Sequence, residues 1–200
     1  MPKVTDEHRQ EMRLRIQNAA LACFIRKGFT GASMSDIIKE AGLSAGAVYI
    51  YYSSKAELTI DVGRRIMEQR VGVLGDFAAT EEVPPPHVVF PQLLGSIVDD
   101  NPFAPLVLQV WGEASHDSDF TELARQIFAD LSNHFEAYLS TYFERSLGLE
   151  VPAASARAHV LVPAVLALMQ GSMIQIAILG EEARQRVATG LETLLAELVA

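Results

Sequence analysis

Three tyrosines and a lysine stand close together in the sequence, and their chemistry suits contact with phosphate groups. Tyr49, Tyr51 and Tyr52 carry hydroxyls within four positions, and Lys55 follows at the start of a predicted helix. Hydroxyls, an ammonium group and the unpaired N–H groups of a helix start all bind phosphate oxygens. Because three tyrosines are too polar for a fully buried core, the cluster points to a nucleic-acid backbone. Packing of the rings around nearby phenylalanines is the structural alternative.

The residues before this cluster predict two short helices joined by a tight turn. Ser33, with an acid three positions later, matches the capping box that opens a helix, and Ser44 is a good N-cap for a second helix through about Tyr51. Gly42 between them permits the turn. The segment Ile37–Tyr51 therefore has the plan of a helix-turn-helix, whose second helix lies in the major groove of DNA.

Longer helices are predicted on both sides of this segment. The first runs from about Asp6 to Lys27, with Thr5 as its N-cap and Gly28 as its stop. Ser54, again with an acid three positions later, opens a helix that extends over residues 55–79. We expect this helix to link the helix-turn-helix to the rest of the chain.

Helical patterns also dominate the remaining sequence, and strand signals are nearly absent. Three consecutive prolines at 84–86 interrupt the pattern, and helices are predicted at about 87–99, 103–115 and 118–147, the last ended by Gly148. The predicted fold is all-α. It consists of an N-terminal three-helix domain (residues 1–55, with the linking helix 55–79) and a larger helical domain (residues 80–200).

The most apolar part of the chain lies near its C-terminus, between Val160 and Gly180. Its length would span a bilayer, but Pro163, Gln170 and Gln175 interrupt it and no lysine flanks it. We therefore expect a helix of a soluble protein that is covered on all sides. Since its own domain covers one face, the sequence predicts a homodimer through the helices at about 155–180 and 181–199.

The charge of the chain is divided unevenly. The net charge is −9, yet residues 1–70 hold eleven basic and eight acidic side chains, a balance of +3, whereas the rest carries −12. The two parts therefore meet different partners, and the first suits phosphate better. A charged N-terminus and a single cysteine, Cys23, predict a cytoplasmic protein without disulfides.

Residues 16–58, IQNAALACFIRKGFTGASMSDIIKEAGLSAGAVYIYYSSKAEL, resemble the DNA-binding domain of the TetR family of transcriptional repressors. The resemblance lies in the paired alanines before a phenylalanine, the glycine after the first helix, the Ala-Gly turn, the tyrosine, and the Ser-Lys followed by an acid and a leucine. The remaining residues are similar only in style. The resemblance implies a repressor that binds a palindromic DNA operator as a dimer and is released by a small-molecule inducer.

Carried over position by position, the resemblance assigns roles to several residues. Ser33 or Ser35 would contact a phosphate, and Tyr49, Tyr51 and Lys55 would hold the DNA backbone. The residues facing base edges would be Ser44, Ala45, Gly46, Ala47 and Ile50. Since most of these lack a hydrogen-bonding side chain, base recognition would depend on thymine methyl groups, close backbone approach at Gly46 and DNA shape.

The inducer would bind in the second domain, in a mostly apolar pocket with a few polar groups. Ordinary core packing is an equal alternative for each of the candidate residues, which are Phe103, Gln109, Trp111, Phe128, Met169, Gln170 and Met173.

Other classes of function find little support in the sequence. The cluster Glu113, His116, Asp117 and Asp119 has the residue types of a metal site, but helix capping and solvated charge explain it better. No glycine-rich phosphate loop or nucleophile elbow is present, so we expect neither an enzyme nor a cofactor. A helical adaptor that binds protein and not DNA is the alternative function.

Overall fold

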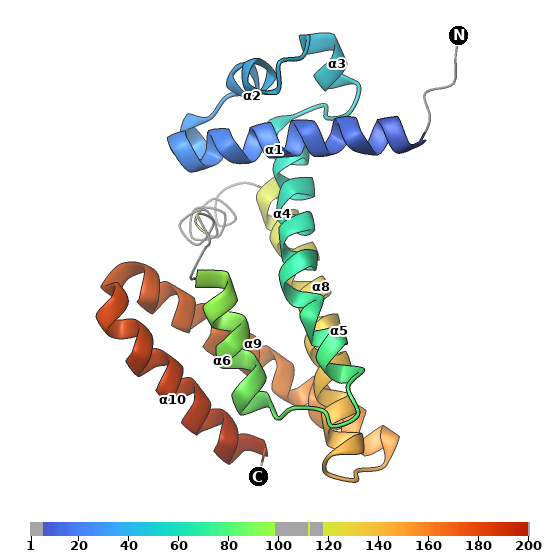
Figure 1. The fold of residues 1–200 in the computed structure, drawn as a ribbon, viewed down its shortest axis with the longest axis vertical. Helices are drawn as coiled ribbons and strands as arrows, with labels where there is room; N and C mark the ends of the chain where they lie inside the picture. The colour runs from blue at the N-terminus through green and yellow to red at the C-terminus, as the bar shows by residue number, and fades with distance from the viewer. Residues whose placement is uncertain (1–5, 99–111, 113–117, 200) are drawn as a thin grey trace. The chain divides into compact units, whose positions relative to one another are not determined.

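The computed structural model describes residues 6–98, residue 112 and residues 118–199, and every element in these ranges is a helix (Figure 1). The all-α prediction is therefore confirmed. The predicted cap Thr5 and the predicted helix at 103–115 lie outside the described residues, apart from residue 112. In chain order the helices are α1 (Asp6–Gly31), α2 (Met34–Ala41), α3 (Ala45–Tyr49), α4 (Lys55–Val71), α5 (Val73–Ala78), α6 (Pro86–Val98), α8 (Ser118–Arg145), α9 (Val151–Leu179) and α10 (Glu181–Val199).

The described chain divides into two compact units. The first contains the residues up to Ile66 and the start of α8 as far as Ala124, and the second contains the remainder. The division between the units falls inside α4, within the segment predicted to link them.

The first unit is built on α1, which packs against α2. Its apolar side chains recur at helical spacing, and Ile16, Ala20 and Phe24 are buried. At Gly28 the backbone leaves the helix with φ of 71°, a conformation that favours glycine, before one more turn ends at Gly31. Gly28 thus interrupts the helix as predicted.

Capping decides where α2 and α3 begin and end. Ser33 and Asp36 form the predicted capping box at the start of α2, and Gly42, in left-handed geometry with φ of 62°, ends it. The hydroxyl of Ser44 accepts a hydrogen bond from the backbone N–H of Ala47 and caps α3. α3 ends at Tyr49 and is therefore shorter than the helix predicted through about Tyr51.

The single helix predicted over residues 55–79 is wrong, because the structure has two helices that meet at Gly72. Gly72 keeps helical angles, but the N–H of Gly75 bonds to its carbonyl three residues back, which tightens the turn. A Cβ atom at Gly72 would lie 2.8 Å from the carbonyl oxygen of Glu68. Only glycine fits this position without a local shift, and the sequence pattern did not reveal that close approach.

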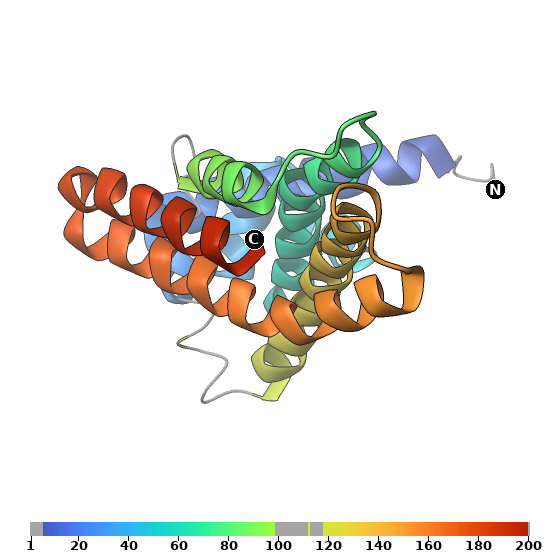
Figure 2. The same cartoon turned by 90° about the horizontal axis from the view of Figure 1, so that it is seen from below.

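In the second unit, α10 packs against both α6 and α9, and the two views show α9 and α10 side by side (Figure 1 and Figure 2). Aromatic rings join α6 to α8: Phe90 stacks on Phe135 with centroids 4.9 Å apart and meets the edge of Tyr138 at 5.6 Å. α8 ends at Arg145, and Gly148, shortly after it, has the predicted left-handed conformation with φ of 68°. The helices predicted at 87–99 and 118–147 are thus present within one or two residues at each end.

α9 is the one described helix that is long and apolar enough to cross a membrane. It nevertheless contacts α6 and α10 and buries a row of side chains, including Val162, Leu166 and Met173, against its own unit. That pattern is typical of a core helix in a bundle.

Candidate nucleic-acid interface

α3 exposes the side chains predicted to face DNA. Val48 is fully buried and anchors the helix, whereas Ala45 and Gly46 are exposed. Tyr49 is 51% exposed and Ile50 is 81% exposed. The candidate base-contacting residues therefore lie on one short, solvent-facing element.

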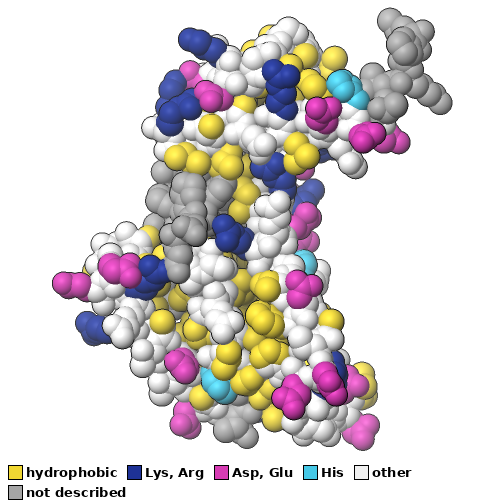
Figure 3. All heavy atoms as spheres, viewed as in Figure 1, with side chains coloured by type: hydrophobic (Ala, Val, Ile, Leu, Met, Phe, Trp, Pro, Cys, Tyr) yellow, Lys and Arg dark blue, Asp and Glu magenta, His cyan; other side chains and the backbone are white. Residues whose placement is uncertain are grey.

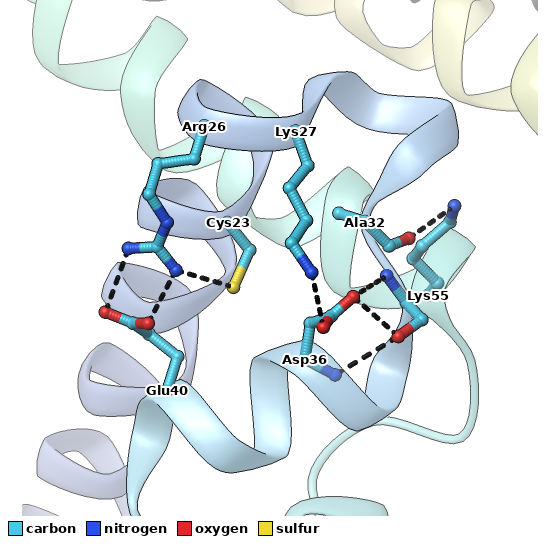
Figure 4. Close-up of polar contacts among 8 residues, drawn as sticks. Cys23, Arg26, Lys27, Ala32, Asp36, Glu40 and Lys55 are labelled. Atoms are coloured by element: carbon cyan, nitrogen blue, oxygen red, sulfur yellow. Dashed lines mark hydrogen bonds and ion pairs between the residues drawn. The ribbon is translucent and has the colours of Figure 1, made fainter.

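Ser33 is engaged inside the protein. Its hydroxyl donates to Asp36 Oδ2 at 2.7 Å and accepts from the Asp36 N–H at 3.2 Å. Lys27 Nζ lies 2.6 Å from the other oxygen of Asp36, and these contacts, that of Lys27 first, lower the pKa of the Asp36 carboxyl well below its usual range (Figure 4). Since the one hydroxyl proton of Ser33 is used, exposed Ser35 is the better candidate for donating to a phosphate.

Lys55, predicted to hold the DNA backbone, makes contacts within its own domain. Its Nζ donates to the carbonyl oxygen of Ala32 at 3.0 Å (Figure 4). It also donates to the carbonyl oxygen of Phe29 at 3.0 Å and lies 4.4 Å from the centroid of the Phe29 ring. The lysine thus fastens the connection between α1 and α2 to the start of α4. One of its three N–H donors remains for a phosphate.

The expectation that all three tyrosines are too polar for the core is wrong for Tyr52, which is 1% exposed. Its hydroxyl donates to Asp61 Oδ2 at 2.5 Å, and the same oxygen accepts from Arg13 and Gln17. A buried tyrosine is permitted here because its one polar atom has a charged partner. Burial and the hydrogen bond to Asp61 raise the pKa of Tyr52 to about 12.

Asp61 was missed by the sequence reasoning. Burial alone would raise the pKa of its carboxyl, but the hydrogen bonds from Tyr52, Arg13 and Gln17 together lower it. Its signal in the sequence was its place in α4, three residues after buried Leu58 and directly before buried Val62, at the edge of the buried face of the helix.

Several basic side chains of α1 are paired within the first unit. Arg15 donates to the carbonyl oxygens of Ala41 and Gly42 at the end of α2, and Arg26 forms an ion pair with Glu40 at 2.6 Å. Figure 3 shows Lys and Arg side chains interspersed with Asp and Glu on the visible face of this unit. On this face the basic side chains are therefore mixed with acidic ones and do not form a patch of positive charge alone.

The candidate inducer-binding residues are placed only in part. Met169 and Met173 are buried in α9, while Phe128 and Gln170 are half-buried. The amide nitrogen of Gln170 is buried and has no hydrogen-bond partner among the described residues. Phe103, Gln109 and Trp111 lie outside the described residues.

The cluster weighed as a metal site also falls largely outside the described part of the chain. Glu113, His116, Asp117 and the side chain of Asp119 lie outside the described residues. Within the described residues, no group of three or more His, Cys, Asp or Glu side chains is arranged to hold a metal ion.

Comparison with known families places the N-terminal region among bacterial regulatory proteins. Residues 16–62 match the model of "Bacterial regulatory proteins, tetR family". This match covers α2, α3 and most of α1, together with the start of α4, including Lys55 and Asp61.

Individual relatives agree with that match. An uncharacterised helix-turn-helix transcriptional regulator of Bacillus subtilis, YfiR, is 45% identical over 67 residues, which are 34% of this chain and 31% of that protein. The regulator PksA of the same organism is 30% identical over 138 residues, 66% of this chain and 65% of that protein. The matched region thus spans about a third of the first curated relative and just under two thirds of the second.

A solved structure extends the similarity of fold over the whole chain. Salmonella enterica GusR superposes with a TM-score of 0.73 over 98% of both chains, at 22% sequence identity. At that identity the likeness concerns the fold alone.

Proposed function

Because this chain belongs, through its N-terminal domain, to the tetR family of bacterial regulatory proteins, we propose that it is a ligand-responsive, DNA-binding transcriptional regulator. It binds a palindromic operator as a homodimer and represses transcription, since occupancy of a promoter is enough to block polymerase. A small-molecule inducer releases it.

The observation that carries this proposal is the exposure of α3. A five-residue helix with a side-chain cap and one buried anchor presents Tyr49, Ile50 and the backbone at Gly46 to solvent. Folding of the chain does not need those residues exposed, whereas a helix that enters the major groove does. Tyr49 and Ser35 would then contact phosphates on either side.

Homodimerisation is supported by an exposed stripe along α9. Val160 is 74% exposed and Ile178 is 71% exposed, although both are large apolar side chains. Small exposed or half-exposed residues lie between them at steps of three and four, and the full stripe is Val160, Ala164, Ala167, Gly171, Ile174 and Ile178. This spacing forms one face of a helix, and small residues at its centre allow a second helix to approach closely.

Inducer binding is assigned to the second unit. Gln170 supports it, since a buried amide nitrogen without a partner is costly unless a ligand accepts its hydrogen bond. α4 is continuous across the division between the two units and could transmit the change. Two half-sites on one face of DNA lie about 34–36 Å apart. A small change in the distance between the two α3 helices of the dimer therefore prevents both from binding their half-sites at once. Release is then a shift of population toward the wider or narrower spacing.

The test is binding of the full-length protein to fluorescent duplexes from the DNA flanking its own gene, followed by anisotropy over a salt series. We expect sequence-specific binding of two chains per palindrome, with affinity that falls steeply as salt rises. Tyr49→Phe should weaken binding, and Thr80→Ala, in the turn after α5, should not. Affinity that is absent, or that is the same for every sequence and salt concentration, would favour the protein-binding adaptor.

A further inference from the structure

α3 and the residue that follows it, Ile50, present an apolar surface to solvent. Among the large hydrophobic side chains in the described part of the protein, Ile50 has the highest exposed fraction, at 81%. Ile50 follows the last residue of α3, and Ala45, the first residue of the helix, is exposed too. A single exposed apolar residue needs no explanation, but a short helix whose exposed residues are almost all apolar is suited to an apolar partner surface.

Nothing in the described part of the chain requires glycine at position 46. Gly46 lacks positive φ, and a Cβ atom built on it meets no atom within 4 Å. Gly42 and Gly72 differ: the first has φ of 62° and the second has a carbonyl 2.8 Å from the Cβ position. Glycine weakens a helix relative to alanine, and at this open position on α3 it leaves room for the backbone of the helix to come close to a partner.

Polar side chains that identify bases are missing from α3. Between Ser44 and Ile50 the one side chain with a hydrogen-bonding group is that of Tyr49. The nearby cations Arg15 and Lys55 donate to carbonyl oxygens of their own domain. Paired hydrogen bonds to guanine or adenine require arginine, lysine, asparagine or glutamine, so this chemistry is absent from α3.

We propose that α3 selects its DNA site through the C5-methyl groups of thymine and through groove shape. Ile50 and Ala45 make the apolar contacts, and Gly46 lets the helix backbone approach the base edges. This inference rests on the proposed DNA-binding function. Transferring one methyl-sized group out of water favours binding by about fourfold, so several thymines per half-site give substantial discrimination.

The first experiment alters the DNA and leaves the protein unchanged. A duplex is selected by the full-length protein from random sequences, and each thymine of a half-site is replaced in turn by deoxyuridine, which lacks only the methyl group. We expect two or more positions at which affinity falls by about fourfold. Deoxyuridine outside the half-sites is the control and should change nothing.

A second set of duplexes tests the opposite mode of recognition. Replacing guanine or adenine by its 7-deaza analogue removes the N7 acceptor that side-chain donors use. We expect no change in affinity. If the 7-deaza bases weaken binding and deoxyuridine does not, the proposal is overturned while DNA binding itself stands. If no duplex is selected, both the proposal and the proposed function are wrong.

Two protein variants locate the contacts. Ile50→Ala should bind the thymine and deoxyuridine duplexes more equally than the original chain does. Gly46→Ala should unfold at a higher temperature, because alanine favours the helix, yet bind the selected duplex at least tenfold more weakly. Unchanged affinity in Gly46→Ala would exclude close approach at that residue.

Discussion

At the residue scale, the most instructive side chain is Lys55. Its sequence position after three tyrosines indicates a phosphate contact, but two of its hydrogen bonds go to the carbonyls of Phe29 and Ala32. A cation at this place orders the α1–α2 connection, and so any effect on DNA binding would come partly through the position of α2. Loss of affinity in a Lys55 variant is therefore not by itself proof of contact with DNA.

Replacing Lys55 by methionine should separate the two roles. Lys55→Met keeps an unbranched side chain of similar length over the Phe29 ring but removes both hydrogen bonds. Hydrogen bonds from a charged group contribute about 1.5–3 kcal/mol. We expect the free energy of unfolding in urea to fall by about 2 kcal/mol. Lys39→Met, which removes the same charge from an exposed position on α2, is the control. Equal stability of the two variants would mean that the Lys55 contacts are not significant.

Asp61 should make the stability of the first unit sensitive to acid. Its folded-state pKa lies below the ordinary value of 3.8, so its stabilising effect is complete above that value and is lost as the pH falls below it toward the lowered pKa. Asp61→Asn should therefore be less stable than the original chain at pH 7, by about 1–3 kcal/mol. The gap should narrow as the pH falls below the ordinary value of 3.8.

Urea unfolding at a series of pH values measures that gap. Glu40→Gln is a comparison, because the pKa of Glu40 is also lowered but its ion pair with Arg26 is exposed. Exposed pairs contribute at most about 1 kcal/mol, so the gap for Glu40→Gln should be smaller. A gap for Asp61→Asn that does not vary with pH would contradict the assigned role.

At the element scale, local signals in the sequence predicted the helix boundaries well where a side chain forms the cap. Ser33 and Ser44 cap as predicted, and Gly28, Gly42 and Gly148 adopt positive φ. These features depend on a few neighbouring residues, which explains why sequence alone reveals them.

Features that depend on distant neighbours could not be predicted in the same way. Tyr52 is buried because Asp61, Arg13 and Gln17 come together from two other helices. The break between α4 and α5 is local, since the carbonyl oxygen near the Gly72 Cβ position belongs to Glu68, yet no sequence pattern distinguishes Gly72 from Gly63 within α4. The sequence thus predicted the exposed helix α3 but missed the contacts that position it, and the role of α3 in binding DNA stays a prediction.

Two serines of one helix start allow capping and DNA contact to be measured separately. Ser33→Ala removes the cap of α2 and should lower the free energy of unfolding by about 1 kcal/mol. Ser35→Ala alters an exposed hydroxyl and should leave stability within about 0.5 kcal/mol, while weakening DNA binding. Urea unfolding and anisotropy on the same preparations measure both quantities. Reduced stability in Ser35→Ala with unchanged DNA affinity would contradict these assignments.

At the scale of the whole molecule, the two parts of the chain differ in charge and in exposed surface. The first 70 residues carry +3 and expose an apolar tip on α3, whereas the remainder carries −12 and exposes an apolar stripe on α9. An acidic second part repels DNA and so restricts contact to the first. Strong net charge also opposes association of two copies, so the proposed dimer requires that the α9 stripe bury enough apolar area to overcome that repulsion.

That stripe should determine the oligomeric state. Its centre consists of small residues, so a large charged side chain there would both prevent close approach and leave a charge buried between two helices.

Gly171→Arg should shift the protein in sedimentation equilibrium from twice the mass of the 21.8-kDa chain to once that mass. A Cβ atom at Gly171 would meet no atom of the described chain within 4 Å, apart from the backbone of its own helix, so we expect the chain to stay folded, as circular dichroism would verify. Ala129→Arg, on an exposed position of α8, adds the same side chain outside the stripe and should remain dimeric. Under the proposed function two linked reading helices bind a palindrome, so the monomeric variant should also lose most of its operator affinity while retaining weak, salt-sensitive binding to any duplex. A Gly171→Arg protein that stays dimeric would move the interface away from α9 and leave its exposed stripe to another partner.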